Sequence, residues 1–278
     1  MDTKKVWLVT GASKGLGLFL VKKLLNEGYQ VAATSRNVES LEKEVGISAS
    51  FLPLEVHLTD EKSVSNAITK TLEAFGTIDV VVNNAGYGQI GALEELSDQE
   101  ARQNFDINVF GSLTIIRNVM PHFRSKKSGH IINIASIAGL LGTFPGFGIY
   151  CATKFAMVGF TESLSAEVKE FGIKATVVYP GYFRTNFLDK GSLNLPQNPI
   201  EDYTAVRNSE RWHESEMKGN QPGSPEKAAL AFIQLAESEN PPLHFIMGSD
   251  AFGMAKNKIE ELQNELSTNE ALSKSTDF

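Results

Sequence analysis

Short apolar runs alternate along this chain with longer stretches in which apolar residues recur at helical spacing. This alternation is typical of βαβ units, in which each strand of a parallel sheet is followed by a helix. The short runs are rich in Val and Ile, as expected for strands that are covered on both faces. They predict strands at residues 6–9, 31–34, 51–56, 80–82, 131–135, 175–178 and 243–247.

The helical spacing predicts helices at residues 16–26, 63–75, 150–171, 225–237 and 255–266. After Pro180 the rhythm breaks, because residues 182–224 carry aromatic side chains and prolines without a clean period. So long an irregular segment is typically a functional lid or a disordered stretch. Residues 254–278 are expected to form a polar helix and a tail that frays after Leu266. The pattern predicts one α/β domain over residues 1–278, a doubly wound parallel sheet of about seven strands with helices on both faces.

Composition and charge narrow the function classes. The 278 residues are 42% hydrophobic and 21% charged, which is ordinary globular usage, and the net charge of −7 disfavours a nucleic-acid partner. No apolar run approaches the ~18 residues that span a bilayer, so we expect neither membrane association nor a secretion signal. The single cysteine, Cys151, excludes an intrachain disulfide and suits a reducing compartment, which predicts a cytoplasmic protein. No histidine spacing suggests a metal site, and we expect surface or loop positions for His122, His130, His213 and His244.

A glycine-rich turn, TGASKGLG, lies between the first predicted strand and the first predicted helix. Its glycines are Gly11, Gly15 and Gly17, with Ser13 and Leu16 between them. Glycines at this spacing let the backbone approach a pyrophosphate, while the helix N-terminus offers free N–H groups. A tight loop without a ligand is the alternative, but the position between strand and helix favours a dinucleotide site. No Gly-Lys-Ser/Thr triplet closes the turn, which argues against an ATP-type phosphate loop.

The end of the second predicted strand bears on which dinucleotide binds. An NAD-preferring site carries an acidic residue there, which binds the ribose 2′-hydroxyl. This chain has Ser35 and Arg36 instead, and Lys14 adds a second cation in the glycine turn. Two cations without a carboxylate suit a 2′-phosphate, so the sequence predicts that NADP(H) is preferred over NAD(H). The alternative is that both cations are solvated surface charges.

A candidate acid–base pair lies in the helix predicted at residues 150–171. Tyr150 and Lys154 are four positions apart, so their side chains share one helix face. A phenol has an ordinary pKa near 10, and a neighbouring ammonium group is expected to lower that pKa and make the phenol a usable acid. Such pairs are common by chance. This one gains weight from Ser136, which follows a buried strand, and from Asn108, which follows the NNAG turn.

Taken together, the motifs resemble those of the short-chain dehydrogenase/reductase family, in its short single-domain branch. They occur in the family's order: TGASKGLG, NNAG at residues 83–86, INV around Asn108, the strand-end Ser136, YCATK at residues 150–154 and PGYFRT at residues 180–185. The resemblance covers about residues 5 to 250. The closing segment, GSDAFGMAKNKIEELQNELSTNEALSKSTDF, is similar to a bacterial group labelled 17β-hydroxysteroid-dehydrogenase-like, a label of kinship and not of substrate.

The resemblance implies a Rossmann fold with strand order 3-2-1-4-5-6-7 and hydride transfer between NADP(H) and a carbonyl or alcohol substrate, as in NADPH-dependent reduction of a ketone or aldehyde. Tyr150 would give a proton to the carbonyl oxygen, and Lys154 would tune Tyr150 and hold the nicotinamide ribose. Ser136 would polarise the carbonyl, while Asn108 would anchor a water that feeds protons towards Lys154. The remaining cofactor contacts would come from Asn84, Ala85, Gly86, Pro180, Gly181, Phe183 and Thr185.

One position departs from the family pattern. The family usually has an aspartate after the third strand, in a stretch such as LDVTD, that binds the adenine amino group. This chain reads VHLTD there, with His57 in place of the aspartate. A neutral imidazole nitrogen could accept the same hydrogen bond, which predicts that His57 contacts the adenine. The alternative is a ring that points to solvent.

Substrate and assembly are also implied by the resemblance. Aromatic side chains in segments that border the pocket in related folds predict an apolar substrate of moderate size; they are Phe144, Phe147, Tyr182, Phe187 and Trp212. The alternative is that most of them pack in the core. The helix at residues 150–171 resembles one that forms a two-fold interface in relatives, so a homodimer or homotetramer is expected.

Two other functions stay open at this point. A non-catalytic NADP(H)-binding sensor would keep the fold, but it has no need of Asn108, Ser136, Tyr150 and Lys154 together. A sugar-nucleotide epimerase or dehydratase of the extended branch usually shows G-x-x-G-x-x-G and a larger C-terminal domain. The glycine spacing and the length argue against it.

Overall fold

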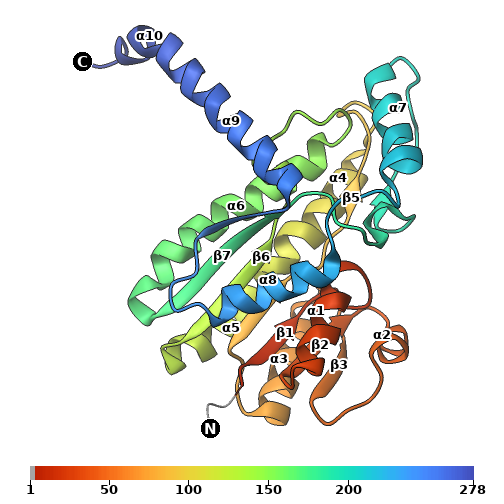
Figure 1. The fold of residues 1–278 in the computed structure, drawn as a ribbon, viewed down its shortest axis with the longest axis vertical. Helices are drawn as coiled ribbons and strands as arrows, with labels where there is room; N and C mark the ends of the chain where they lie inside the picture. Colours follow the sequence, from red (N-terminus) through yellow and green to blue (C-terminus); the bar gives the residue numbers. More distant parts are fainter. Residues whose placement is uncertain (1–3) are drawn as a thin grey trace.

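The apolar runs form a seven-stranded parallel sheet in the computed structural model, which describes residues 4–278 (Figure 1). The strand order is β3-β2-β1-β4-β6-β7-β9, so the predicted order 3-2-1-4-5-6-7 is confirmed once the short β5 and β8 are set aside. The strands of this sheet are β1 (Val6–Val9), β2 (Gln30–Ser35), β3 (Phe51–Glu55), β4 (Val80–Asn83), β6 (Gly129–Ile134), β7 (Ile173–Pro180) and β9 (His244–Met247).

Helices cover both faces of the sheet. The helices of residues 4–278 are α1 (Gly15–Asn26), α2 (Val38–Val45), α3 (Glu61–Phe75), α4 (Asp98–Phe105), α5 (Gly111–Lys126), α6 (Gly148–Val168), α7 (Thr204–Arg211), α8 (Pro225–Glu237), α9 (Ser249–Thr268) and α10 (Glu270–Lys274). Successive side chains of a strand point to opposite faces, so Trp7 and Val9 of β1 pack towards α1 and α8. Leu8 packs on the other face, towards α3, α5 and α6. Both faces are therefore core, which explains the unbroken apolar runs.

Capping side chains mark where several helices begin. Asn37, Asp60, Ser97 and Ser224 each accept a backbone N–H bond at the first turn of α2, α3, α4 and α8. At α4 the cap is reciprocal, because Glu100 accepts the backbone N–H of Ser97 in return. The helix predicted at residues 150–171 is α6 followed by a 3₁₀ turn (Lys169–Phe171).

The chain after Pro180 is more regular than its sequence indicates. It contains a 3₁₀ turn (Asn186–Leu188), the strand β8 (Leu193–Asn194), which pairs in parallel with β5 (Gly88–Gln89), the helix α7 and the π-helical segment η5 (Trp212–Met217). The tail expected to fray after Leu266 is helical, because α9 continues to Thr268 and α10 follows. Figure 1 shows these two helices projecting away from the sheet. Within residues 4–278, no helix combines the length and apolar character needed to cross a bilayer.

The loops that carry the motifs meet at one edge of the sheet. β1, β4, β6 and β7 are adjacent parallel strands, so their carboxyl ends share an edge. The glycine turn follows β1, the NNAG turn ends β4, Ser136 follows β6, and the PGYFRT segment follows β7. Motifs far apart in the sequence are therefore neighbours in the fold.

Candidate active site

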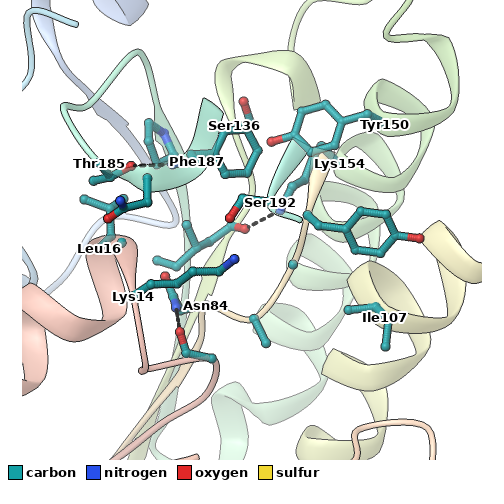
Figure 2. Close-up of a pocket in the computed structure, with 18 of the residues that line it drawn as sticks. Lys14, Leu16, Asn84, Ile107, Ser136, Tyr150, Lys154, Thr185, Phe187 and Ser192 are labelled. Carbon is teal, nitrogen blue, oxygen red and sulfur yellow. Dashed lines mark hydrogen bonds between the residues drawn. The ribbon is translucent and has the colours of Figure 1, made fainter. Parts of the chain in front are cut away.

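A cavity of about 590 Å³ lies at this carboxyl edge. Figure 2 shows Ser136, Tyr150 and Lys154 gathered at one end of it, with Lys14, Leu16 and Asn84 at the other. Most predicted site residues line the cavity, namely Gly11, Ser13, Lys14, Gly15, Leu16, Ser35, Arg36, Asn84, Ala85, Gly86, Ser136, Tyr150, Lys154, Pro180, Gly181, Phe183 and Thr185. Gly17, His57 and Asn108 are the predicted residues outside the lining.

The glycine turn packs closely against the loop after β4. A Cβ on Gly11, whose φ is 63°, would lie 2.7 Å from the Cα of Ala85, and one on Gly17 would lie 2.5 Å from Asn84 Nδ2. Asn84 holds the two loops together by donating to the carbonyl oxygens of Thr10 at 2.9 Å and Gly11 at 3.1 Å. Gly17 is thus required by the turn without lining the cavity itself.

Two cations share the end of the cavity that the glycine turn forms. Partial burial, followed by the nearby charge of Arg36, lowers the pKa of Lys14, while Asp189 acts in the opposite direction. Lys14 Nζ also lies 3.3 Å from the carbonyl oxygen of Gly191, to which it donates. Two positive charges near each other repel, and an anion bound near both relieves that repulsion. Ser35, the last residue of β2, adds no negative charge.

Tyr150 lies on α6 with its phenol buried beside Ser136. Burial raises the pKa of the Tyr150 phenol above its ordinary value, and the hydrogen bond with the Ser136 hydroxyl lowers it by less. This direction is opposite to the lowering predicted from the Tyr150–Lys154 spacing. Desolvation is the largest influence on the pKa of Tyr150, and the Lys154 ammonium group lies 5.7 Å from the Tyr150 ring centroid. A phenol of this kind keeps its proton at neutral pH and acts as a donor.

Lys154 lies beneath Tyr150 on the same helix face. Its Nζ donates to the carbonyl oxygen of Ile134 at 2.9 Å, and burial lowers the pKa of Lys154 to about 8. The loop after β4 passes close by, since a Cβ on Gly86 would lie 3.6 Å from Lys154 Nζ. Lys154 therefore sits between α6, β6 and the NNAG turn.

Asn108 supports this arrangement from below. It lies in the π-helical segment η1 (Asp106–Phe110) and is fully buried. Its Oδ1 accepts the N–H of Tyr87 at 3.0 Å, while its Nδ2 donates to the carbonyl oxygen of Tyr87 and to Thr153 Oγ1, both at 3.0 Å. These bonds tie η1 to the NNAG loop and to α6, so the side chain has no direct contact with the cavity.

His57 lies on the surface and not in the cavity wall. Side chains alternate after β3, so Val56 and Leu58 line the cavity whereas the His57 ring turns outward. Its Nε2 lies 3.6 Å from the Glu55 carboxylate, and its side chain is 58% exposed. The predicted contact between His57 and the adenine is therefore not part of the site proposed below.

The other end of the cavity is aromatic. Phe144, Phe147, Tyr182 and Phe187 line it as expected, whereas Trp212 lies behind Tyr182 with ring centroids 5.8 Å apart. A buried histidine that sequence reasoning placed among surface and loop residues, His213, also faces the cavity. Nothing in the irregular sequence around it signals this position, because the position depends on how η5 packs over the sheet edge.

Known proteins are similar to this chain in sequence and in fold. A family model described as short chain dehydrogenase matches residues 5–194. Oxidoreductase BOA17 of Botryotinia fuckeliana is 34% identical over 93% of this chain and 94% of its own length. The crystal structure of a short-chain dehydrogenase from Streptomyces avermitilis, 34% identical, matches 100% of both chains with a TM-score of 0.90. The chain therefore belongs to the short-chain dehydrogenase family.

Two structural neighbours carry the cofactor. The 3-ketoacyl-(acyl-carrier-protein) reductase of Brucella melitensis, 25% identical, was solved with NADH; it matches 87% of this chain and 96% of its own with a TM-score of 0.72. ElxO, 28% identical, was solved with NADP and matches 88% and 96% with a TM-score of 0.72. This chain is accordingly an oxidoreductase of the family, with a nicotinamide cofactor.

Proposed function

We propose that the protein reduces a ketone or aldehyde with NADPH, or catalyses the reverse oxidation of an alcohol. The observation that carries the proposal is that one continuous cavity joins Tyr150, Ser136 and Lys154 to the glycine turn and its two cations. A sensor without catalytic activity would need only the glycine turn and the two cations that bind the cofactor.

The residues at the glycine end fit NADP(H). The close approach of Gly11 to Ala85 keeps the turn free of side chains, and the N-terminus of α1 follows it. Lys14 and Arg36 would hold the 2′-phosphate beside the uncharged Ser35, and Asn84 to Gly86 would lie along the nucleotide. Pro180, Gly181, Phe183 and Thr185 would border the nicotinamide. When bound, the cofactor supplies the hydride.

At the catalytic end, each side chain has one proposed task. Tyr150 donates its proton to the substrate oxygen, which becomes strongly basic as the carbonyl is reduced. Ser136 donates a hydrogen bond to the same oxygen and orients the carbonyl. Lys154 keeps positive charge next to the phenolate that forms, and Asn108 is a positioning residue that fixes the NNAG loop against α6.

Turnover tests this assignment. NADPH oxidation, followed by absorbance with a panel of ketones and aldehydes, should show activity in the wild type. Tyr150→Phe is expected to fold and bind NADPH normally and to lose at least about a hundredfold in kcat, the usual scale of positioned acid catalysis. Near-native turnover in that variant would assign the proton donor to another group. Cofactor binding without turnover of any substrate would favour the sensor function.

Tyr179→Phe is the matched control for this experiment. Tyr179 is a buried tyrosine whose hydroxyl lies 2.9 Å from His244 Nδ1, outside the cavity lining. The Tyr179→Phe variant also loses one tyrosine hydroxyl group, and it should keep wild-type turnover.

Substrate class and location complete the proposal. The rings of Phe144, Phe147 and Phe187 favour an apolar substrate of moderate size, and residues 182–224 would form its binding segment. Cys151 is buried and unpaired, which supports a reducing compartment such as the cytoplasm. A homodimer or homotetramer formed through α6 is proposed as the assembly.

A further inference from the structure

A second polar group faces the cavity, separate from Tyr150 and Ser136. Tyr182, in the loop after β7, and His213, on η5, both line it. The Tyr182 hydroxyl lies 3.0 Å from His213 Nε2. His213 is only 5% exposed, so its ring nitrogens depend on partners within the protein.

The contacts of His213 fix where its proton lies. Nδ1 is 2.7 Å from the carbonyl oxygen of Ser209, which can only accept, so Nδ1 carries the proton. Burial lowers the pKa of His213, although the Ser209 bond opposes this, so the ring is neutral near pH 7. Nε2 is then an acceptor, and Tyr182 donates its hydroxyl proton to it. The Tyr182 oxygen can still accept a hydrogen bond from a ligand in the cavity through its lone pairs.

Contacts made by the carboxylates of Asp250 and Glu95 hold the segments that carry the pair in place. The N–H of Tyr182 donates to Asp250 Oδ2 at 2.7 Å. On the other side, Arg207 of α7 lies 2.8 Å from the buried carboxylate of Glu95, which anchors the helix that leads into η5. The pair is therefore a fixed feature of the cavity wall.

One aromatic ring lies close to both the pair and the proposed proton donor. The Phe147 ring centroid lies 4.9 Å from that of His213 and 6.0 Å from that of Tyr150. The Phe187 ring lies 6.0 Å from Tyr150. A substrate whose carbonyl oxygen meets Tyr150 would lay its carbon frame along these rings and reach Tyr182 with its far end.

We propose that the Tyr182–His213 pair binds a hydroxyl or N–H group of the substrate away from the reacting carbonyl. The substrate is then an apolar ketone or aldehyde that carries such a donor. A group that only accepts hydrogen bonds is disfavoured, because Tyr182 could donate to it only by leaving the buried Nε2 unpaired. This inference rests on the proposed carbonyl reduction.

Matched ketones test the inference. We take benzylacetone, its meta- and para-hydroxy derivatives, and the corresponding methoxy derivatives, which can accept but not donate. The wild type should prefer at least one hydroxy compound over its methoxy counterpart by at least about tenfold in kcat/KM, the effect of one lost hydrogen bond. Tyr182→Phe should remove that preference, so that the kcat/KM values of the hydroxy compound and its methoxy counterpart come within about threefold of each other. An unchanged preference in the variant, or none in the wild type, overturns the proposal.

Binding gives a second readout that does not need turnover. Trp212 lies against Tyr182, so its fluorescence should report ligands that bind at this end of the cavity in the enzyme loaded with oxidised cofactor. Hydroxy compounds should bind more tightly than methoxy compounds in the wild type and equally in Tyr182→Phe. If benzylacetone and its derivatives bind with this preference and none is reduced, the carbonyl reduction fails and the pair's role stands. If they are reduced without the preference, only the pair's role fails.

Two variants control for structural damage. Tyr179→Phe breaks the tyrosine–histidine bond to His244 outside the cavity and should keep the hydroxy preference. His213→Gln keeps a polar side chain while removing the fixed ring, and it should weaken the preference without abolishing reduction of benzylacetone. Loss of activity on all ketones in Tyr182→Phe but not in Tyr179→Phe would mean that Tyr182 maintains the cavity and does not select substrates, which contradicts the proposal.

Discussion

Burial sets the protonation of the two titratable side chains at the proposed catalytic end, Lys154 and Tyr150. Lys154 has a pKa of about 8 because its ammonium group is desolvated, whereas the Tyr150 phenol holds its proton more firmly than an ordinary tyrosine. Lys154 is thus charged below about pH 8 and becomes neutral as the pH rises through that value. We expect kcat/KM for reduction to fall as the pH rises through about 8, because the phenolate formed at Tyr150 then loses its neighbouring cation.

A pH profile at saturating NADPH measures this effect, with cofactor affinity determined over the same range. Lys154→Arg keeps the charge, since a guanidinium group stays protonated, and should move the decline to higher pH in whatever activity remains. A flat wild-type profile from about pH 6 to 10 would contradict the role given to Lys154.

Single residues also show where sequence reasoning stops. The spacing of Tyr150 and Lys154, the strand-end position of Ser136 and the family resemblance together predicted three side chains that line the same cavity. The direction of the Tyr150 pKa was not predictable, because burial depends on the packing of the whole sheet edge. The outward ring of His57 and the inward ring of His213 were not predictable for a related reason: which way each ring faces depends on strand alternation after β3 at one and on the packing of η5 at the other.

Among the elements, the strands of the main sheet were the most predictable, whereas the helices α2, α4, α5, α7 and α10 were not predicted. Strands buried on both faces need continuous apolar runs, and such runs are readable. The helices α2 and α7 were not predicted because each buries one apolar side chain, Leu41 and Val206, which creates no period. The pairing of β5 with β8 is long-range and only two residues long, so no local pattern indicates it.

The loop after β2 contains Arg36, which we propose binds the 2′-phosphate of NADPH. Arg36→Ala removes a charge-assisted contact to the 2′-phosphate, which is worth roughly 1.5–3 kcal/mol. We expect the Kd for NADPH to rise by about tenfold or more and that for NADH to change little. Arg102→Ala is the control, since Arg102 is an exposed arginine paired with Asp98 outside the cavity lining. Equal losses of NADPH and NADH affinity in Arg36→Ala would contradict the proposal that Arg36 binds the 2′-phosphate.

At the scale of the whole molecule, one surface of α6 lacks the charged residues expected of a solvated helix face. Ala152, Phe155 and Gly159 are exposed at helical spacing on it. The segment η1 packs against α6 and exposes Phe110. The side chains of Phe155 and Phe110 are 45% and 54% exposed. Apolar residues gathered on an exposed face indicate a protein partner, and a two-fold axis would let the same face of a second copy cover it.

We therefore expect the wild type to scatter light as a dimer or tetramer of the 30.4 kDa chain. Phe155→Glu should reduce the assembly at least to its next smaller form, because two-fold symmetry brings each introduced carboxylate close to its copy in an apolar contact. Ile259→Glu is the matched control: Ile259 is an exposed apolar residue on the projecting α9, and its replacement should leave the mass unchanged. A change of mass in Ile259→Glu but not in Phe155→Glu would place the interface on α9. A wild type that stays at the mass of one chain over working concentrations would exclude the assembly altogether.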